Sequence, residues 1–133
     1  MKKLYPLLLL VVLAACKKEK KAENIVIQAM VNGQWKVTNF NKSGTDMTAS
    51  FVTYKFQFKS DFTVDAINNG SVEKTGSWNA DAVAQSITSN FSNAVNPVAL
   101  LNGTWTITNN SWTWVEAKQT TNGELLNLRL DKQ

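Results

Sequence analysis

An alternation of apolar and polar residues with a period of two constrains the fold of this chain more than any other feature. Its clearest stretch is Tyr54-Lys55-Phe56-Gln57-Phe58, in which every second residue is aromatic. Successive side chains of a β-strand point to opposite faces, so the pattern predicts strands with one buried face. The same period recurs in eight short segments, at residues 35–38, 54–58, 62–66, 72–78, 85–91, 104–108, 111–116 and 126–130.

Turn-forming residues separate several of these segments, at Asn68-Asn69-Gly70, Asn109-Asn110 and Asn122-Gly123. Asparagine and glycine tolerate the positive φ of tight turns, so these sites predict hairpins between neighbouring strands. A meander of eight strands leaves two open edges unless its first and last strands pair. We therefore predict an all-β fold, an eight-stranded antiparallel up-and-down barrel. The same alternation also permits a two-layer β-sandwich.

The N-terminus follows a different pattern. Lys2 and Lys3 precede the apolar run Leu7–Leu13, and Ala14-Ala15 leads into Cys16, the only cysteine. This layout resembles a bacterial lipoprotein signal with its lipobox, which implies cleavage before Cys16 and lipid attachment to it. The run is too short for a transmembrane helix, which needs about 20 residues. The alternative is an ordinary secretory signal that leaves Cys16 as a free thiol.

These features divide the chain into three parts. We expect a signal peptide at residues 1–15, a lipidated tether with a short helix at 16–32, and the barrel domain at 33–133. The helix is predicted over residues 25–31 because Asn32-Gly33 can end it, and an extra edge strand is the alternative. Lipid on Cys16 predicts attachment to a cell-envelope membrane, the outer membrane, on either its periplasmic or its surface side.

Charge and residue inventory exclude several function classes. The net charge is +4, but from Gly33 onward eight basic residues balance eight acidic ones, so the domain offers no basic face to nucleic acid. Without histidine, and with its only cysteine assigned to lipid, the chain lacks the groups for Ser-His-Asp or Cys-His catalysis and for His/Cys metal sites. Asp61, Asp65 and Glu73 are expected to be solvated. We therefore predict that the protein is not an enzyme and needs no cofactor. We also expect a monomer.

Short motifs add a resemblance to a known family. Gly33-Gln34-Trp35 resembles the G-x-W of lipocalins. The order of the Tyr54 strand, Gly76-Ser77-Trp78, Trp105-Thr106-Ile107 and the final leucine strand is similar to the lipocalin-like domain of Bacteroidetes lipoproteins. The resemblance implies an up-and-down barrel that holds a small apolar ligand.

The lipocalin resemblance also implies a contact between the first and last strands, where a basic residue covers the G-x-W tryptophan. Arg129, the only arginine, lies in the last predicted strand, which gives the hypothesis of a Trp35–Arg129 contact. Alternation turns Arg129 outward if Leu126, Leu128 and Leu130 point inward, so this contact stays open.

The candidate binding site is the aromatic inner face of the barrel. Besides the predicted pocket residues, which are named at the end of this paragraph, alternation places Phe62, Asn39 and Glu116 on the inner face. Two longer loops complete the domain: residues 41–50 are polar and expected to be mobile, and residues 92–102 are apolar, with a helical turn starting at Pro97 that serves as a lid or a plug. The predicted pocket residues are Trp35, Tyr54, Phe56, Phe58, Trp78, Trp105, Trp112 and Trp114.

Two functions remain compatible with this pattern. The first is a lipid-anchored envelope lipoprotein that binds a small apolar or amphipathic molecule inside the barrel, with the aromatic residues as its lining. The second is an interaction or inhibitor module of the envelope without a small-molecule ligand, in which the same aromatic residues only fill the core.

Overall fold

A computed structural model describes residues 25–133 of the 133-residue chain. The predicted signal peptide, Cys16 and the tether as far as residue 24 lie outside the described residues. The described part is mostly β, with one short α-helix at residues 25–31 before the first strand. The predictions of an all-β fold and of a short N-terminal helix are therefore confirmed.

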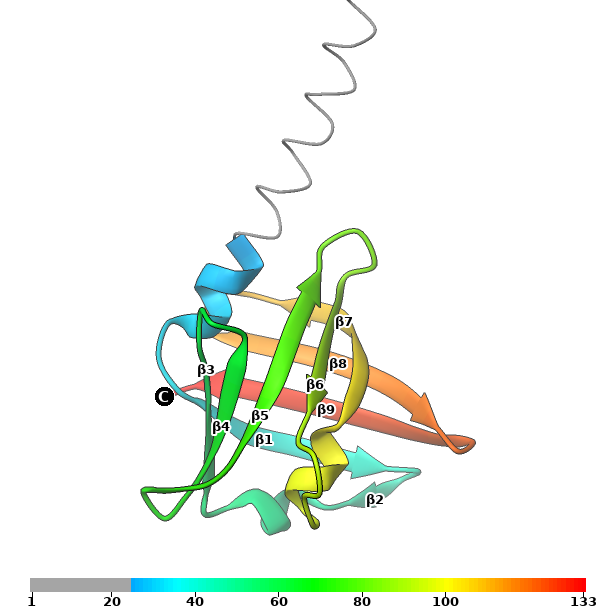
Figure 1. The fold of residues 1–133 in the computed structure, drawn as a ribbon. Helices are drawn as coiled ribbons and strands as arrows, with labels where there is room; N and C mark the ends of the chain where they lie inside the picture. Colours follow the sequence, from blue (N-terminus) through cyan, green and yellow to red (C-terminus); the bar gives the residue numbers. More distant parts are fainter. Residues whose placement is uncertain (1–24) are drawn as a thin grey trace, which may run out of the picture.

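Apart from β2, the strands follow one another as antiparallel neighbours (Figure 1). Two single-turn 3-10 helices, η1 (Thr48–Phe51) and η2 (Val98–Leu101), interrupt the series. The strands are β1 (Trp35–Lys42), β2 (Thr45–Asp46), β3 (Tyr54–Phe58), β4 (Thr63–Asn68), β5 (Ser71–Asp81), β6 (Ser86–Asn90), β7 (Gly103–Asn110), β8 (Trp114–Thr121) and β9 (Glu124–Lys132).

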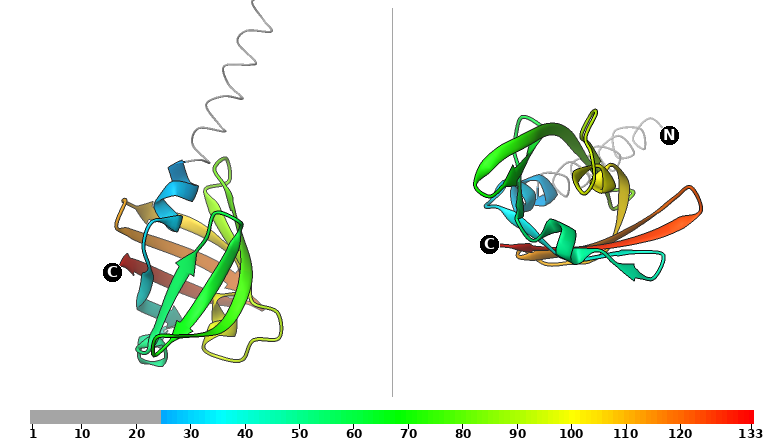
Figure 2. Two further views of the ribbon diagram at one scale, coloured as in Figure 1. Left: turned by 60° about the vertical axis from the view of Figure 1, so that its left-hand side comes forward. Right: turned by 90° about the horizontal axis from the view of Figure 1, so that it is seen from below.

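Pairing of β1 with β9 closes the sheet into a barrel (Figure 2). The two strands are antiparallel and share seven paired positions, from Trp35 opposite Lys132 to Lys42 opposite Leu126. β2 pairs only with β1 and extends it outside the ring of eight strands. The predicted eight-stranded barrel is confirmed, and the sandwich alternative is wrong because the first and last long strands are hydrogen-bonded neighbours.

The alternation that predicted the strands sets the core in most of them. Tyr54, Phe56 and Phe58 of β3 are buried, while Lys55 between them is exposed. The leucines of β9 at positions 126, 128 and 130 are likewise buried. Their burial excludes solvent from the barrel interior and stabilises the fold through apolar surface removed from water.

A bulge in β1 reverses the alternation after its third residue. The register against β9 shifts between Val37 and Asn39, so Thr38 and Asn39 are both exposed and Phe40 is fully buried. An extra residue on one strand of an antiparallel pair turns the following side chains to the other face. The prediction that Asn39 points inward is therefore wrong.

β8 uses the opposite phase from the one predicted. Val115 and Ala117 point into the core, while Trp114 and Glu116 lie on the outer face, and Trp112 is 56% exposed in the turn before the strand. The predicted turn at residues 109–110 is also wrong, because β7 runs through Asn110 after a register shift near residue 108. Phe62, predicted inside, is 42% exposed and precedes β4.

The two barrel ends are closed by different elements (Figure 2). Helix 25–31 covers the end at which β1 begins, and Gly33 follows it with φ +88°, a conformation that glycine adopts without strain. η1 and η2 cover the opposite end. The expectation of a mobile loop at residues 41–50 is wrong, because the segment forms the β1–β2 hairpin and η1, whose Phe51 is fully buried.

Candidate functional site in the barrel interior

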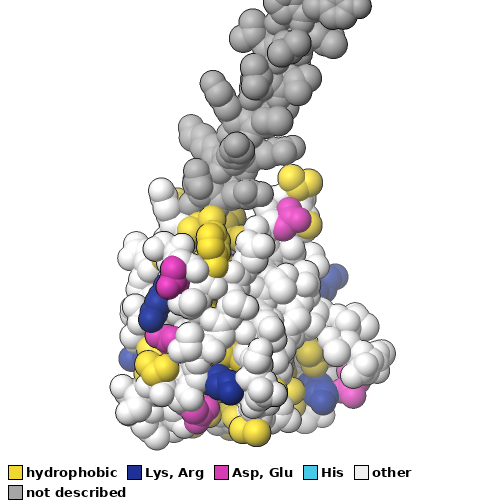
Figure 3. Space-filling view, viewed as in Figure 1, with side chains coloured by type: hydrophobic (Ala, Val, Ile, Leu, Met, Phe, Trp, Pro, Cys, Tyr) yellow, Lys and Arg dark blue, Asp and Glu magenta, His cyan; other side chains and the backbone are white. Residues whose placement is uncertain are grey.

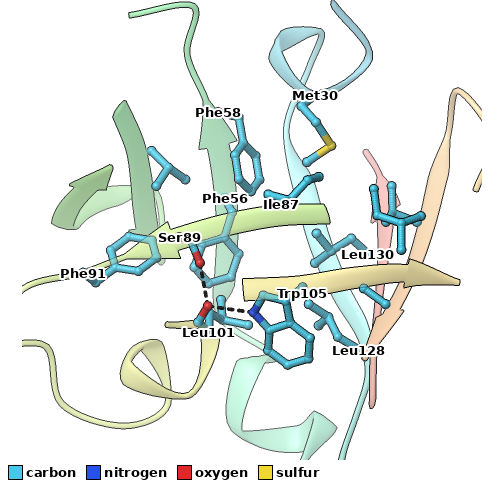
Figure 4. Close-up of a pocket in the computed structure, with 14 residues that line it drawn as sticks. Met30, Phe56, Phe58, Ile87, Ser89, Phe91, Leu101, Trp105, Leu128 and Leu130 are labelled. Atoms are coloured by element: carbon cyan, nitrogen blue, oxygen red, sulfur yellow. Dashed lines mark hydrogen bonds between the residues drawn. The ribbon is translucent and has the colours of Figure 1, made fainter. Parts of the chain in front are cut away.

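The barrel interior contains one apolar cavity of about 40 Å³ beneath helix 25–31 (Figure 4). Ser89 is the lining residue with a hydroxyl group, and this hydroxyl donates a hydrogen bond to the Leu101 carbonyl at 2.5 Å. The lining is therefore suited to an apolar group rather than a charged one. The lining residues are Met30, Phe56, Phe58, Val64, Ile87, Ser89, Phe91, Leu101, Trp105, Ile107, Val115, Ala117, Leu128 and Leu130.

The size of the cavity limits what it can hold in this conformation. Pockets for drug-sized ligands measure about 300–1,000 Å³, several times the 40 Å³ found here. The surrounding aromatic rings fill the remaining space: Phe56 and Phe91 lie with ring centroids 6.3 Å apart, and Phe40 and Trp105 lie 6.0 Å apart. A ligand larger than a few atoms needs part of the lining to move.

The structure brings three of the eight predicted pocket residues together around the cavity: Phe56, Phe58 and Trp105. Trp35, Tyr54 and Trp78 are buried in the same core but do not line the cavity. The prediction is wrong for Trp112 and Trp114, which lie outside the barrel because of the phase of β8. The small side chains Val115 and Ala117 take the interior positions of β8 instead.

Met30 and Leu101 are lining residues that strand alternation cannot reveal, because they belong to the elements that cover the barrel ends. Met30 follows Val26 and Ile27 by four and three residues, a helical spacing that places the three side chains on one face. That spacing is the sequence signal for an inward face of the helix. For Leu101 the signal was the apolar composition of the loop.

η2 is firmly attached to the barrel wall. The Leu101 carbonyl accepts hydrogen bonds from Ser89 Oγ and from Trp105 Nε1, the latter at 2.9 Å. The Asn102 side chain accepts from the Phe91 amide at 2.6 Å, and the Asn102 carbonyl accepts from Gln119 Nε2 at 2.9 Å. Between the alternatives of lid and plug, these bonds make the 92–102 loop a plug, and the predicted helical turn after Pro97 is confirmed as η2.

Helix 25–31 is attached more lightly. Within the described residues, its hydrogen bond to a side chain of the barrel is the one that Trp35 Nε1 donates to the Met30 carbonyl at 2.9 Å. Met30 is 2% exposed and projects into the barrel, while Val26, Ile27 and Val31 pack at the rim and are partly buried. Met30 is therefore the roof of the cavity, and the helix that carries it is the less strongly held of the two end covers.

The hypothesis of a Trp35–Arg129 contact is wrong, because Arg129 points outward and lies over Trp114, with its Cζ 4.6 Å from the ring centroid. Lys132 takes the expected place, with Nζ 5.1 Å from the Trp35 ring centroid. On the outer face Arg129 also donates to Asp131 at 3.0 Å, and this hydrogen bond lowers the pKa of the Asp131 carboxyl. Lys132 takes this role because it lies two residues after the buried Leu130, on the same face of β9, and pairs directly with Trp35.

The three carboxylates considered in the sequence analysis each accept a hydrogen bond from a different partner. Asp65 is 6% exposed, contrary to the expectation of a solvated group, and Lys59 Nζ lies 2.7 Å from it. The hydrogen bond from Lys59 lowers the pKa of Asp65. Glu73 accepts a hydrogen bond from the Tyr54 hydroxyl at 2.8 Å, and Asp61 binds the Thr63 amide. Each carboxylate therefore has a local structural partner.

The fold and the interior together define the class of protein: a small closed antiparallel barrel with an aromatic core and a covering element at each end. No protein-family model matches the chain, and no curated protein matches it. One solved structure with a similar fold is that of a DUF4847 family protein from Bacteroides vulgatus ATCC 8482. It aligns with a TM-score of 0.56 and 14% sequence identity, over 81% of this chain and 99% of that chain. At this identity the similarity shows the shared fold.

Membrane-spanning helices are absent from residues 25–133, where no helix has the length and hydropathy to cross a bilayer.

Proposed function

We propose that this chain is a lipid-anchored envelope lipoprotein whose barrel takes up a small apolar or amphipathic molecule when helix 25–31 lifts from the barrel end. The observation that carries the proposal is the apolar cavity roofed by Met30. The lipobox-like sequence before Cys16 supports the anchor. Helix 25–31 makes fewer hydrogen bonds to the barrel wall than η2 does, which supports entry at the end covered by the helix.

The cost of opening follows from what the helix buries. Exposing the Met30 side chain costs about 1.5–3 kcal/mol, and its carbonyl loses a hydrogen bond worth about 0.5–1.5 kcal/mol. Met30 and its hydrogen bond together cost about 2–4.5 kcal/mol, which corresponds to a closed-to-open ratio between about 30 and 2,000. The partly buried Val26, Ile27 and Val31 add to this cost. The apparent affinity for a ligand falls by the same factor, so uptake requires a ligand that gains more than this by leaving water.

Truncating the roof tests the proposal. We expect Met30→Ala to enlarge the cavity and to lower the cost of opening, and so to tighten binding of a lipophilic probe by about tenfold, which corresponds to about 1.4 kcal/mol. The assay is energy transfer from Trp105 and its neighbours to cis-parinaric acid, in a chain that starts at Lys17 and keeps every described residue.

Met47→Ala is the matched control, because Met47 is a partly buried methionine beside η1 at the opposite end of the barrel. We expect it to leave probe binding unchanged. Equal affinities for the Met30 and Met47 variants would refute entry under the helix. Absence of energy transfer in all three proteins would refute interior binding altogether and leave the interaction-module hypothesis.

A further inference from the structure

The connections of the barrel place a set of exposed apolar side chains around the end covered by helix 25–31. In this topology the β3–β4, β5–β6 and β7–β8 loops lie at the end where β1 begins and β9 finishes. Each of these three loops carries one large exposed apolar side chain, and the first described residue adds a fourth at the same end. In the order of the chain, these residues are Ile25, Phe62, Val83 and Trp112. Figure 3 shows hydrophobic side chains gathered at this end, over the helix and the β5–β6 loop. We call this set the tether-end ring.

The two exposed aromatic residues distinguish this end from the other. The opposite end also exposes apolar groups, but they are aliphatic: Val52, Val72, Val95 and Leu125. Among the described residues, the exposed large aromatic side chains are Trp112 and Phe62, with 56% and 42% of their surface accessible to solvent. Both belong to the tether-end ring. Tryptophan is enriched at the boundary between lipid and water, and phenylalanine is common on the apolar face of segments that lie in this boundary.

Phe62 is held in this position against its backbone preference. Its φ of +65° lies in the left-handed region, which is unfavourable for a bulky residue. The Phe62 amide donates to the Lys59 carbonyl at 3.0 Å, and the Phe62 carbonyl accepts from the Trp78 amide at 2.9 Å. These bonds fix a turn that holds the ring over Trp78, with centroids 5.7 Å apart, and leaves its outer part in solvent.

The length of the tether determines which end of the barrel can reach the lipid surface. Eight residues separate Cys16 from Ile25, and a chain of this length spans at most about 29 Å. The 11 residues of β5 rise about 36 Å along the strand, or about 28 Å along the axis at a typical barrel tilt. Only a fully extended tether could bring the opposite end to the bilayer.

We propose that the tether-end ring rests on the membrane that holds the lipid of Cys16, with Trp112 and Phe62 at the boundary between headgroups and acyl chains. The inference rests on the lipid anchor of the proposed function. It adds the orientation of the barrel: helix 25–31 faces the bilayer, and η1 and η2 face away from it.

Depth-dependent quenching tests this orientation in the full-length lipidated protein. The protein is reconstituted into phosphatidylcholine vesicles whose acyl chains carry bromine near the headgroup, and tryptophan emission is compared with that in unbrominated vesicles. Trp35, Trp78 and Trp105 are buried in the barrel, and Trp114 is half-buried beneath the Arg129 guanidinium. We therefore expect the larger part of the quenching to come from Trp112 and to be lost in Trp112→Phe. Leu125→Trp in the Trp112→Phe background places a probe at the opposite end, where we expect no quenching.

Equal quenching of wild type and Trp112→Phe would overturn the orientation, and so would quenching of the probe at position 125. Flotation of the same samples separates this result from failure of the anchor. Protein that floats with vesicles but shows no Trp112 quenching is anchored without the proposed contact. Protein that does not float, like the Cys16→Ser control, refutes the anchor and with it the orientation.

Discussion

Replacing Phe40 by alanine tests how the bulge in β1 builds the core. Phe40 is fully buried, and its ring centroid lies 5.2 Å from that of Phe51 and 6.0 Å from that of Trp105. Truncating a buried phenylalanine to alanine costs about 3–5 kcal/mol, since the transfer free energy is lost and a cavity remains. In a domain of this size Tm falls by about 4 °C per kcal/mol, so we expect a decrease of about 12–20 °C.

The matched control is Phe62→Ala, because Phe62 is 42% exposed and its ring lies at the edge of the core beside Trp78. We expect this variant to lose less than about 1 kcal/mol. Urea unfolding followed by tryptophan emission gives both free energies of unfolding. A loss below about 1 kcal/mol for Phe40→Ala, no larger than that of Phe62→Ala, would show that Phe40 is not buried and that β1 carries no bulge at residue 38.

Two further substitutions test contacts on the barrel wall. Asp65→Asn removes the ion pair with Lys59. In the folded state the pKa of Asp65 lies below its unfolded value of about 3.9. The ionised carboxylate therefore stabilises the fold above that pH, and its contribution disappears as pH falls through the folded pKa. We therefore expect the urea midpoint of the variant to fall below that of wild type at pH 7 and to approach it under acidic conditions, and a pH-independent difference would contradict the reasoning. In Gly76→Ala the new Cβ would lie 2.5 Å from the Asn90 carbonyl oxygen and 2.8 Å from the Phe91 ring, which predicts a loss of about 1–3 kcal/mol in thermal unfolding, against no measurable loss for the exposed neighbour Ser77→Ala.

The barrel was predictable from the sequence because its strands are amphipathic and its turns are short. Strands β3, β6, β7 and β9 have the inward residues that alternation assigned to them. The Asn69-Gly70 and Asn122-Gly123 turns fall where the sequence predicts them, with positive φ at all four residues. In these places local turn chemistry and the hydrophobic period agree, so one register is favoured.

The errors lie where two phases of the alternation were both plausible. In β8 the phase of Trp112 and Trp114 is more hydrophobic, but the interior already holds Trp105, Phe56 and Phe91. Close packing leaves room only for small side chains there, so Val115 and Ala117 face inward. Volume inside a closed barrel is a property of all strands together and cannot be derived from one segment.

The candidate site was predicted only in part for a related reason. Alternation identifies residues on the wall, and it found Phe56, Phe58 and Trp105. The roof and the floor of the cavity come from elements outside the barrel strands, Met30 on helix 25–31 and Leu101 on η2. Their positions depend on how the end covers dock, which is a tertiary effect without a period in the sequence.

The two end covers differ in how they are held, and this difference connects the proposed uptake with the proposed orientation. Opening at η2 would break the bonds that Ser89, Trp105 and Gln119 make to residues 101–102, whereas opening at the helix breaks the bond between Trp35 and Met30. At about 0.5–1.5 kcal/mol for each bond, the helix end is the cheaper route by about 1–3 kcal/mol from these bonds alone. With the tether-end ring on the bilayer, the cheaper route is also the one that opens toward lipid. An apolar molecule would then pass from the membrane into the cavity without crossing water, and the Met30→Ala variant should take up probe faster from vesicles when lipid-anchored than when it lacks Cys16.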